Sequence, residues 1–200
     1  MTSIAPTAEA RRSPVLTLLD KYEAAWPAEA AVVQQIRTLV LDHADCFDRT
    51  CRPGHLTGSA WVVSADAARH LLLHHRKLDK WLQPGGHADG DPDLAAVALR
   101  EAAEETNLAG LEVLRGKPTL LDVDVHLIPA RYDAAGELLE DAHEHHDLRF
   151  LIRAGGNETL VGNEESNALR WCTPTEVRAL TNEPSVLRLL DKSADRLAVK

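Results

Sequence analysis

The chain has 200 residues, of which 44% are hydrophobic and 26% are charged, and its 31 acidic and 22 basic side chains give a formal net charge of −9. These values predict an ordinary globular protein that is long enough to bury a core of its own. They exclude a protein that mainly coats nucleic acid or an anionic membrane, because such proteins need excess positive charge.

Neither export nor membrane insertion is indicated by the sequence. No apolar stretch approaches the about 20 residues of a membrane span, and the first residues have no signal-peptide pattern. Cys46, Cys51 and Cys172 form an odd set without a CxxC pair, which is typical of reduced thiols, although a Cys46–Cys51 bridge is an alternative. We therefore expect a cytoplasmic protein with no membrane or nucleic-acid partner.

The apolar spacing predicts two helices near the N-terminus, over residues 14–25 and from Pro27 onward, after a frayed tail of about a dozen residues. The later elements predicted from the sequence are, in chain order, strands at 58–64 and 71–73, a QPGG turn, a helix at 91–106, strands at 108–114, 120–128 and 148–154, and helices after Thr173 and Pro184. Strands mixed with a few helices predict an α/β fold with a mixed sheet that is covered on both faces. We divide the chain into a helical N-terminal extension, residues 1–55, and a second domain, residues 56–200.

The predicted helix after the glycine turn carries three glutamates near its end. At about 100° per residue, Glu104 and Glu105 lie within about 60° and 40° of Glu101, so all three share one stripe. Leu94 and Val97 fall on the same stripe, which therefore faces the core. Like charges at this spacing repel one another, and Mg²⁺ or Mn²⁺ would relieve that repulsion with the oxygen ligands it prefers. An exposed acidic helix end, partly neutralised by Arg100, is the simpler alternative.

This stretch resembles the sequence box of the Nudix hydrolases, the MutT-like family. That box runs through a glycine, a glutamate, an Arg-Glu pair, an apolar residue, two glutamates, a glycine and an apolar residue at fixed spacings. The positions that fall in register here are Gly86, Arg100, Glu101, Ala102, Glu104, Glu105 and Leu108. The resemblance implies the Nudix-type α/β/α sandwich with a mixed β-sheet, preceded here by the helical extension.

Two positions depart from the family pattern. Pro92 stands where the family has its first glutamate, and Asn107 replaces the late glycine. Asn is the next best residue after Gly in the left-handed conformation that often follows a helix, so we expect that turn to survive. We expect Pro92 to be the first residue of the helix, behind Asp91, and Asp91 or Asp93 to replace the missing acid as the partner of Arg100.

By resemblance, the protein cleaves the diphosphate of a nucleoside-diphosphate derivative with Mg²⁺ or Mn²⁺. The implied metal ligands are Glu101, Glu104 and Glu105, together with a backbone carbonyl of the glycine turn at Gly86. Glu101 and Glu105 are also implied in catalysis, Glu101 as a possible base, while Arg100 orients carboxylates. The family often supplies one more acid from a later loop, for which Glu144 is the first candidate and Asp147, Glu164 and Glu165 follow.

Several residues near the turn and in the histidine-rich segment are weaker candidates. Positive charge for phosphate is available from Arg76, Lys77 and Lys80, and Trp81 could stack on a ring, although a solvated charge run and a core tryptophan are the simpler interpretations. The segment DAHEHHD, residues 141–147, is interpreted as a surface loop tip. A zinc site built from His43, Cys46, Cys51 and His55 is a further alternative.

Two other functions remain open. One is a non-catalytic nucleotide-sensing module, suggested by Pro92 and the helical extension. The other is an isopentenyl diphosphate isomerase-like enzyme, because His55 and His87, with the box acids, resemble the metal-binding histidines of those isomerases. Such enzymes need a cysteine near the corresponding turn, and none stands near Gly85 and Gly86. The apolar face of the N-terminal helices suggests a homodimer, with packing inside one chain as the alternative. The substrate itself is not indicated by any motif.

Overall fold

The computed structural model describes residues 7–198. Its helices are α1 (Ala8–Ala25), the short 3₁₀ turn η1 (Pro27–Glu29), α2 (Ala30–Asp42), α3 (Leu94–Thr106), α4 (Pro174–Leu180) and α5 (Pro184–Ala198). Its strands are β1 (Gly54–Val63), β2 (His70–His75), β3 (Lys80–Leu82), β4 (Gly85–His87), β5 (Glu112–Val113), β6 (Leu120–Ile128), β7 (Arg131–Tyr132), β8 (Leu138–Glu140), β9 (His143–Arg153) and β10 (Ser166–Cys172). Of the helices described, none is long and apolar enough to cross a membrane.

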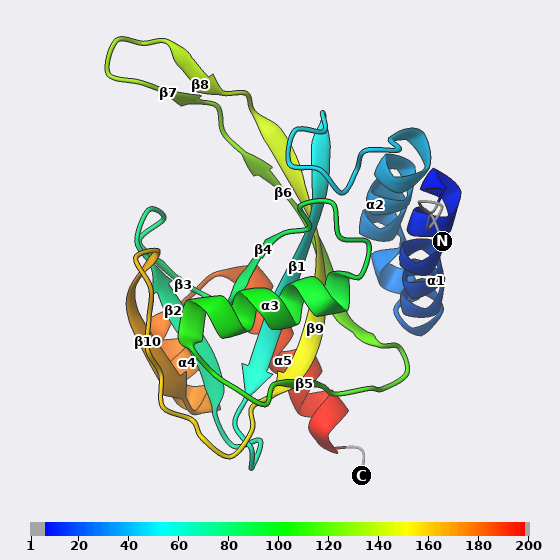
Figure 1. The fold of residues 1–200 in the computed structure, drawn as a ribbon. Helices are drawn as coiled ribbons and strands as arrows, with labels where there is room; N and C mark the ends of the chain where they lie inside the picture. The colour runs from blue at the N-terminus through cyan, green and yellow to red at the C-terminus, as the bar shows by residue number, and fades with distance from the viewer. Residues whose placement is uncertain (1–6, 199–200) are drawn as a thin grey trace, which may run out of the picture.

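One eight-stranded sheet organises the fold. Its order is β10-β2-β1-β9-β5, with β3 on β2, β4 on β1 and β6 on β9. The central pair, β1 and β9, runs parallel, and the pairs around it are antiparallel. Helix α3 crosses one face of this sheet while α4 and α5 lie behind it (Figure 1). The mixed sheet between helices confirms the predicted α/β/α architecture.

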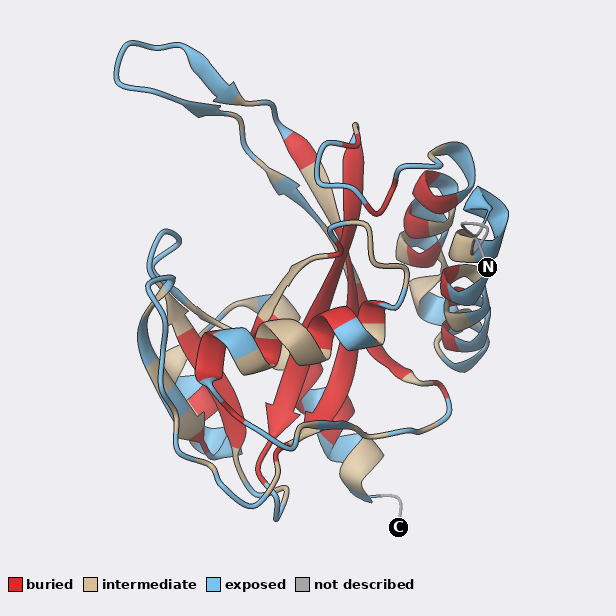
Figure 2. Ribbon diagram, in the orientation of Figure 1, coloured by how far each residue is buried: buried red, intermediate tan, exposed pale blue. Residues whose placement is uncertain are grey.

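The central strands are buried on both faces, as Figure 2 shows for β1 and β9. Alternation along β1 sends Leu56, Ala60 and Val62 into a core under α3, and Trp61 and Val63 into a second core under α4 and α5. The second core is anchored by the Trp61 indole, which donates a hydrogen bond to Ser193 Oγ on α5 (2.9 Å). The site elements thus rest on a packed sheet, which restricts their movement.

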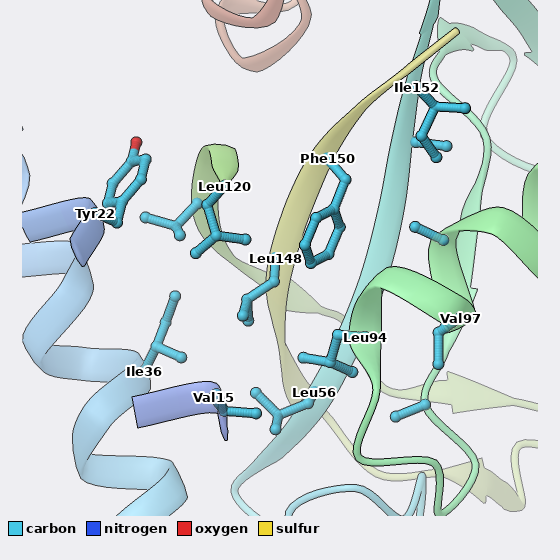
Figure 3. Packing of buried hydrophobic residues seen from close by; sticks show 14 of the residues in the cluster. Val15, Tyr22, Ile36, Leu56, Leu94, Val97, Leu120, Leu148, Phe150 and Ile152 are labelled. Carbon is cyan, nitrogen blue, oxygen red and sulfur yellow. The ribbon is translucent and has the colours of Figure 1, made fainter. Parts of the chain in front are cut away.

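The N-terminal helices pack on the same core. Val15 of α1 points toward Leu56 of β1, and Tyr22 of α1 and Ile36 of α2 lie beside Leu120 of β6 and Leu148 of β9 (Figure 3). The expected frayed tail is wrong from Ala8 onward, because Thr7 caps a helix that continues through Pro14; residues 1–6 lie outside the described part. The apolar face of these helices is thereby used inside one chain, and the expected homodimer stays a prediction.

A buried charge network ties the N-terminal helices to the rest of the molecule. The fully buried carboxylate of Asp122 on β6 accepts hydrogen bonds from Arg149 on β9, and from Arg188 and Lys192 on α5. Burial alone would raise the pKa of Asp122, but these cations hold it below its ordinary value. Lys192 Nζ also lies 2.6 Å from Glu29 Oε1, in η1. Lys192 therefore links the N-terminal helical segment to Asp122 on β6.

Beyond the sheet, strands β7 and β8 form a protruding hairpin, seen at the upper left of Figure 1. Its tip is exposed, including Tyr132, Leu138 and Leu139. Near the C-terminus, Thr173 and Glu176 form the predicted capping box at the start of α4. Strand β10, which sequence reasoning missed, lies at the sheet edge, and Cys172 is its one buried residue.

Candidate active site

The glycine turn lies where the sheet meets α3. Strand β4 pairs with β1 so that Gly86 is opposite Gly58 and Gly85 is opposite Ser59. A Cβ atom on Gly85 would stand 2.3 Å from Ser59 Oγ, and one on Gly86 would stand 2.3 Å from Glu101 Cδ. Glycine at position 85 therefore lets the turn pack closely on β1, and glycine at position 86 lets it approach the acidic helix.

Helix α3 begins later than the sequence predicted. Its N-cap is Asp93, whose carboxylate accepts hydrogen bonds from Ala95 N and Ala96 N (3.1 Å each). Pro92 thus lies in the preceding turn and not at the first helical position, and the Asp91 side chain accepts a bond from Asp93 N (2.9 Å). Expecting Asp91 or Asp93 to pair with Arg100 was therefore wrong, because both carboxylates are used to build this turn.

Arg100 binds the glycine turn and the adjacent acid. Its Nη2 donates to the His87 carbonyl (3.0 Å) and to Glu101 Oε1 (2.9 Å), and its Nε lies 4.0 Å from Glu104 Oε1. The arginine thus fixes the Glu101 carboxylate against the turn. At the other end of the helix, Asn107 has φ 56° and ψ 24°, the left-handed conformation that the sequence predicted.

The three glutamates lie at increasing depth. Glu104 is exposed, Glu101 is half-buried, and Glu105 is only 6% exposed and accepts a hydrogen bond from Gly85 N (3.0 Å). Burial raises the pKa of Glu101, and burial together with the neighbouring acids raises that of Glu105 to about 8. A carboxylate pair whose charge is this unfavourable fits a divalent cation, which supplies the positive charge the site lacks.

The additional acids proposed from the sequence lie in different environments. Glu144 Oε2 is 3.0 Å from His146 Nε2, and its side chain lines a shallow hollow with Thr38 and His43 near α2. Asp147 is buried and accepts bonds from Thr57, Ser59 and Arg149, an arrangement that joins strands. Glu165, in the loop before β10, is among the charges that raise the pKa of Glu105. Glu164, its neighbour, is exposed.

The basic residues before the turn and Trp81 mostly have structural partners. Lys80 Nζ pairs with Glu183 Oε1 (2.8 Å), and Arg76 Nε donates to Asn167 Oδ1 (3.3 Å). Lys77 is exposed. The Trp81 ring lies beside His74, with 5.0 Å between centroids, and packs against the second core.

The histidine-rich segment is not the surface loop tip expected from the sequence. His143 to Asp147 open strand β9, and the parallel register sets His145 opposite His55. The rings of His55, His87, His143 and His145 gather with centroids 4.8–5.3 Å apart. Sequence reasoning missed this cluster because the pairing of two distant strands creates it.

The four residues of the alternative zinc site do not come together in the structure. His43 and Cys51 lie within ligand distance of Asp45, whereas Cys46 is in the hydrophobic core and His55 belongs to the histidine cluster. All three cysteines are free thiols, as predicted. Burial raises the pKa of Cys51 to about 12, which disfavours the thiolate that binds metal.

Comparison with known proteins agrees with this geometry. A family profile described as the NUDIX domain matches residues 55–192. An Ap4A hydrolase of C. elegans, solved as a binary complex, is similar in fold, with TM-score 0.54 and 19% identity over 72% of this chain and 97% of that chain. The Nudix hydrolase RenU of M. smegmatis gives TM-score 0.52 and 18% identity over 72% and 86% of the two chains. Members of this family are typically pyrophosphohydrolases that use divalent metals. The profile covers more than half of the sequence, and the protein therefore belongs to the Nudix hydrolase family.

Proposed function

We propose that the protein is a Mg²⁺- or Mn²⁺-dependent hydrolase that cleaves a diphosphate bond in a small nucleoside-diphosphate derivative. The observation that carries this proposal is the contact between the glycine turn and the acidic end of α3. There Gly85 N donates to Glu105, and the Glu101 carboxylate lies against the Cα of Gly86.

The donor set fits a hard divalent cation. Glu101, Glu104 and Glu105 offer carboxylate oxygens from one helix face, and the Gly86 carbonyl is a further proposed ligand. When bound, the metal would neutralise phosphate oxygens and lower the pKa of the attacking water. Because the pKa of Glu105 is about 8 without a cation, this carboxyl group carries a proton at neutral pH and releases it when it becomes a ligand.

The remaining residues of the site orient these acids. Arg100 holds Glu101 in place through the contacts described above, so we propose a positioning role for it. Among the acids outside the box, we now favour Glu165 over Glu144 as the supporting residue. The charge of Glu165 reaches Glu105, whereas Glu144 is paired with His146 beside α2.

The test is phosphate-product release from a panel of nucleoside-diphosphate derivatives, with Mg²⁺ and then Mn²⁺. Glu105→Gln keeps the acceptor for Gly85 N but cannot become the carboxylate that a metal would bind, and Glu137→Gln, at an exposed position in the hairpin loop, is the matched control. We expect metal-dependent turnover in the wild type and the control, and loss of turnover in Glu105→Gln. Full activity of Glu105→Gln would refute the proposal. Tight nucleotide binding without turnover would instead favour a sensing module.

A further inference from the structure

The cluster of His55, His143 and His145 forms a second potential metal site, separate from the box carboxylates. One ring nitrogen of each residue lies within 4.8 Å of the corresponding nitrogen of the other two. Zinc binds imidazole nitrogen at about 2.0–2.1 Å, so small ring rotations would bring all three nitrogens onto one ion. The residues come from β1 and β9, two paired strands at the centre of the sheet, which restrict their backbone positions.

Three ring nitrogens of this cluster have no hydrogen-bond partner in the described part of the protein. His55 is 1% exposed, and both its Nδ1 and its Nε2 are buried without a hydrogen bond; His145 Nε2 is in the same situation. Buried polar atoms are normally satisfied, and each exception needs an explanation such as an ion. A cation bound by all three imidazoles would explain why these nitrogens have no partner among the described residues.

The tautomer of His143 also suits a metal ligand. His143 Nδ1 lies 2.8 Å from the Asp141 carbonyl, which can only accept, so in the neutral ring Nδ1 carries the hydrogen and Nε2 is the nitrogen that can bind a metal. A carbonyl that fixes the tautomer in this way is the usual outer-shell partner of a metal-binding histidine.

A further imidazole and a carboxylate lie beside the three histidines. The His87 ring is 5.0 Å from those of both His55 and His145. Glu140 Oε1 is 3.9 Å from His143 Nε2 and can balance positive charge. The nearby cation Arg49 is already paired with Asp89 (2.7 Å).

We infer that His55, His143 and His145 bind one late first-row transition-metal dication, of which Zn²⁺ is the prime candidate, in a three-histidine site. Imidazole donors select such ions over Mg²⁺, which prefers oxygen. Three protein ligands leave a fourth coordination position open, as in zinc sites that bind an exchangeable water or substrate. Because His87 follows Gly86 directly, this ion would lie beside the glycine turn, and a phosphate group is the class of ligand that suits its open position.

Co²⁺ binding in a protein that lacks all three box carboxylates tests the inference independently of any hydrolase activity. The background is Glu101→Gln with Glu104→Gln and Glu105→Gln, which removes the competing carboxylate ligands. We expect one equivalent of Co²⁺ per chain, with the strong visible absorption of low-coordinate cobalt, and its displacement by Zn²⁺. Adding His55→Gln or His143→Gln should weaken binding by at least about tenfold, since loss of outer-shell partners alone costs 10–100-fold.

His74→Gln, on β2 and outside the cluster, is the matched control and should bind Co²⁺ unchanged. Circular dichroism identifies variants that fail to fold, and two separate cluster variants guard against that failure. Zn²⁺ should also raise the Tm of the background protein but not that of the cluster variants. The inference is overturned if the folded background protein binds no Co²⁺, or if His55→Gln and His143→Gln bind it as well as His74→Gln.

Discussion

Substituting alanine for Gly86 should disable the site while leaving the fold intact. The new Cβ would stand 2.3 Å from Glu101 Cδ, whereas ordinary contacts begin at 3.4 Å, so the carboxylate must move by at least 3.4 − 2.3 = 1.1 Å. It can do so because it is the end of a flexible side chain, although this breaks its contact with Arg100. A displacement of about 1 Å at a catalytic group can cost about 10²-fold in rate.

We therefore expect Gly86→Ala to lower kcat by about 10²-fold and to weaken Mg²⁺ binding, measured by initial rates and by calorimetry. The free energy of unfolding should change by only about 1 kcal/mol, the usual scale of a Gly-to-Ala replacement. Gly156→Ala is the matched control, because nothing lies within 4 Å of a Cβ at that position. If Gly86→Ala binds Mg²⁺ and turns over as well as Gly156→Ala, the proposed role of this close approach is wrong.

Three further substitutions test the energetics around the site. The folded-state pKa of Glu105, about 8, lies above its ordinary value of 4.5, so the folded state binds this proton more tightly and stability falls as pH rises from about 4.5 to 8. Metal-free Glu105→Gln should therefore gain stability relative to the wild type over that range, by at most about 4–5 kcal/mol at pH 9 in urea unfolding; a pH-independent difference would contradict this. Asp122→Asn should cost about 3–5 kcal/mol by the same assay, because it removes the fully buried anion that Arg149, Arg188 and Lys192 share, and a cost below 1 kcal/mol would show that this anion is dispensable. Asn107→Ala should cost about 1–2 kcal/mol, since it forces an ordinary side chain into the left-handed region, whereas Asn107→Gly should be neutral or stabilising; equal Tm values for the two variants would argue against a conformational role.

The local features of the box helix could be predicted from sequence because they depend on near neighbours. The stripe of Glu101, Glu104 and Glu105 follows from helical periodicity, and the left-handed Asn107 follows from the chemistry of a helix end. The start of the helix was misplaced for a similarly local reason. Asp91 and Asp93 can both act as caps, and periodicity alone does not show which of the two ends the turn.

The histidine cluster and the Asp122 network could not be predicted, because neither is local. His55 and His145 belong to segments that read separately as a connection and a polar loop. Only the parallel register of β1 and β9 makes them neighbours. Lys192 likewise shows no sequence signal for its contact with Asp122, 70 residues earlier. Whether an acid or imidazole is buried depends on such distant pairings, and so does its pKa.

The parallel pairing of β1 with β9 also has a consequence for the kinetics of folding. Thr57 and Asp147, which hydrogen-bond across this pair, are 90 residues apart, and contacts of such long range slow folding because the loop must close before they form. The N-terminal helices can form early from local contacts, whereas the sheet beneath the box helix must await β9. During synthesis from the N-terminus, the histidine cluster cannot assemble until residue 145 has left the ribosome, and the β1–β9 pair cannot be completed until residue 153 has done so. Until then the nascent chain exposes the apolar residues of β1, and this interval is when the protein is most prone to aggregation.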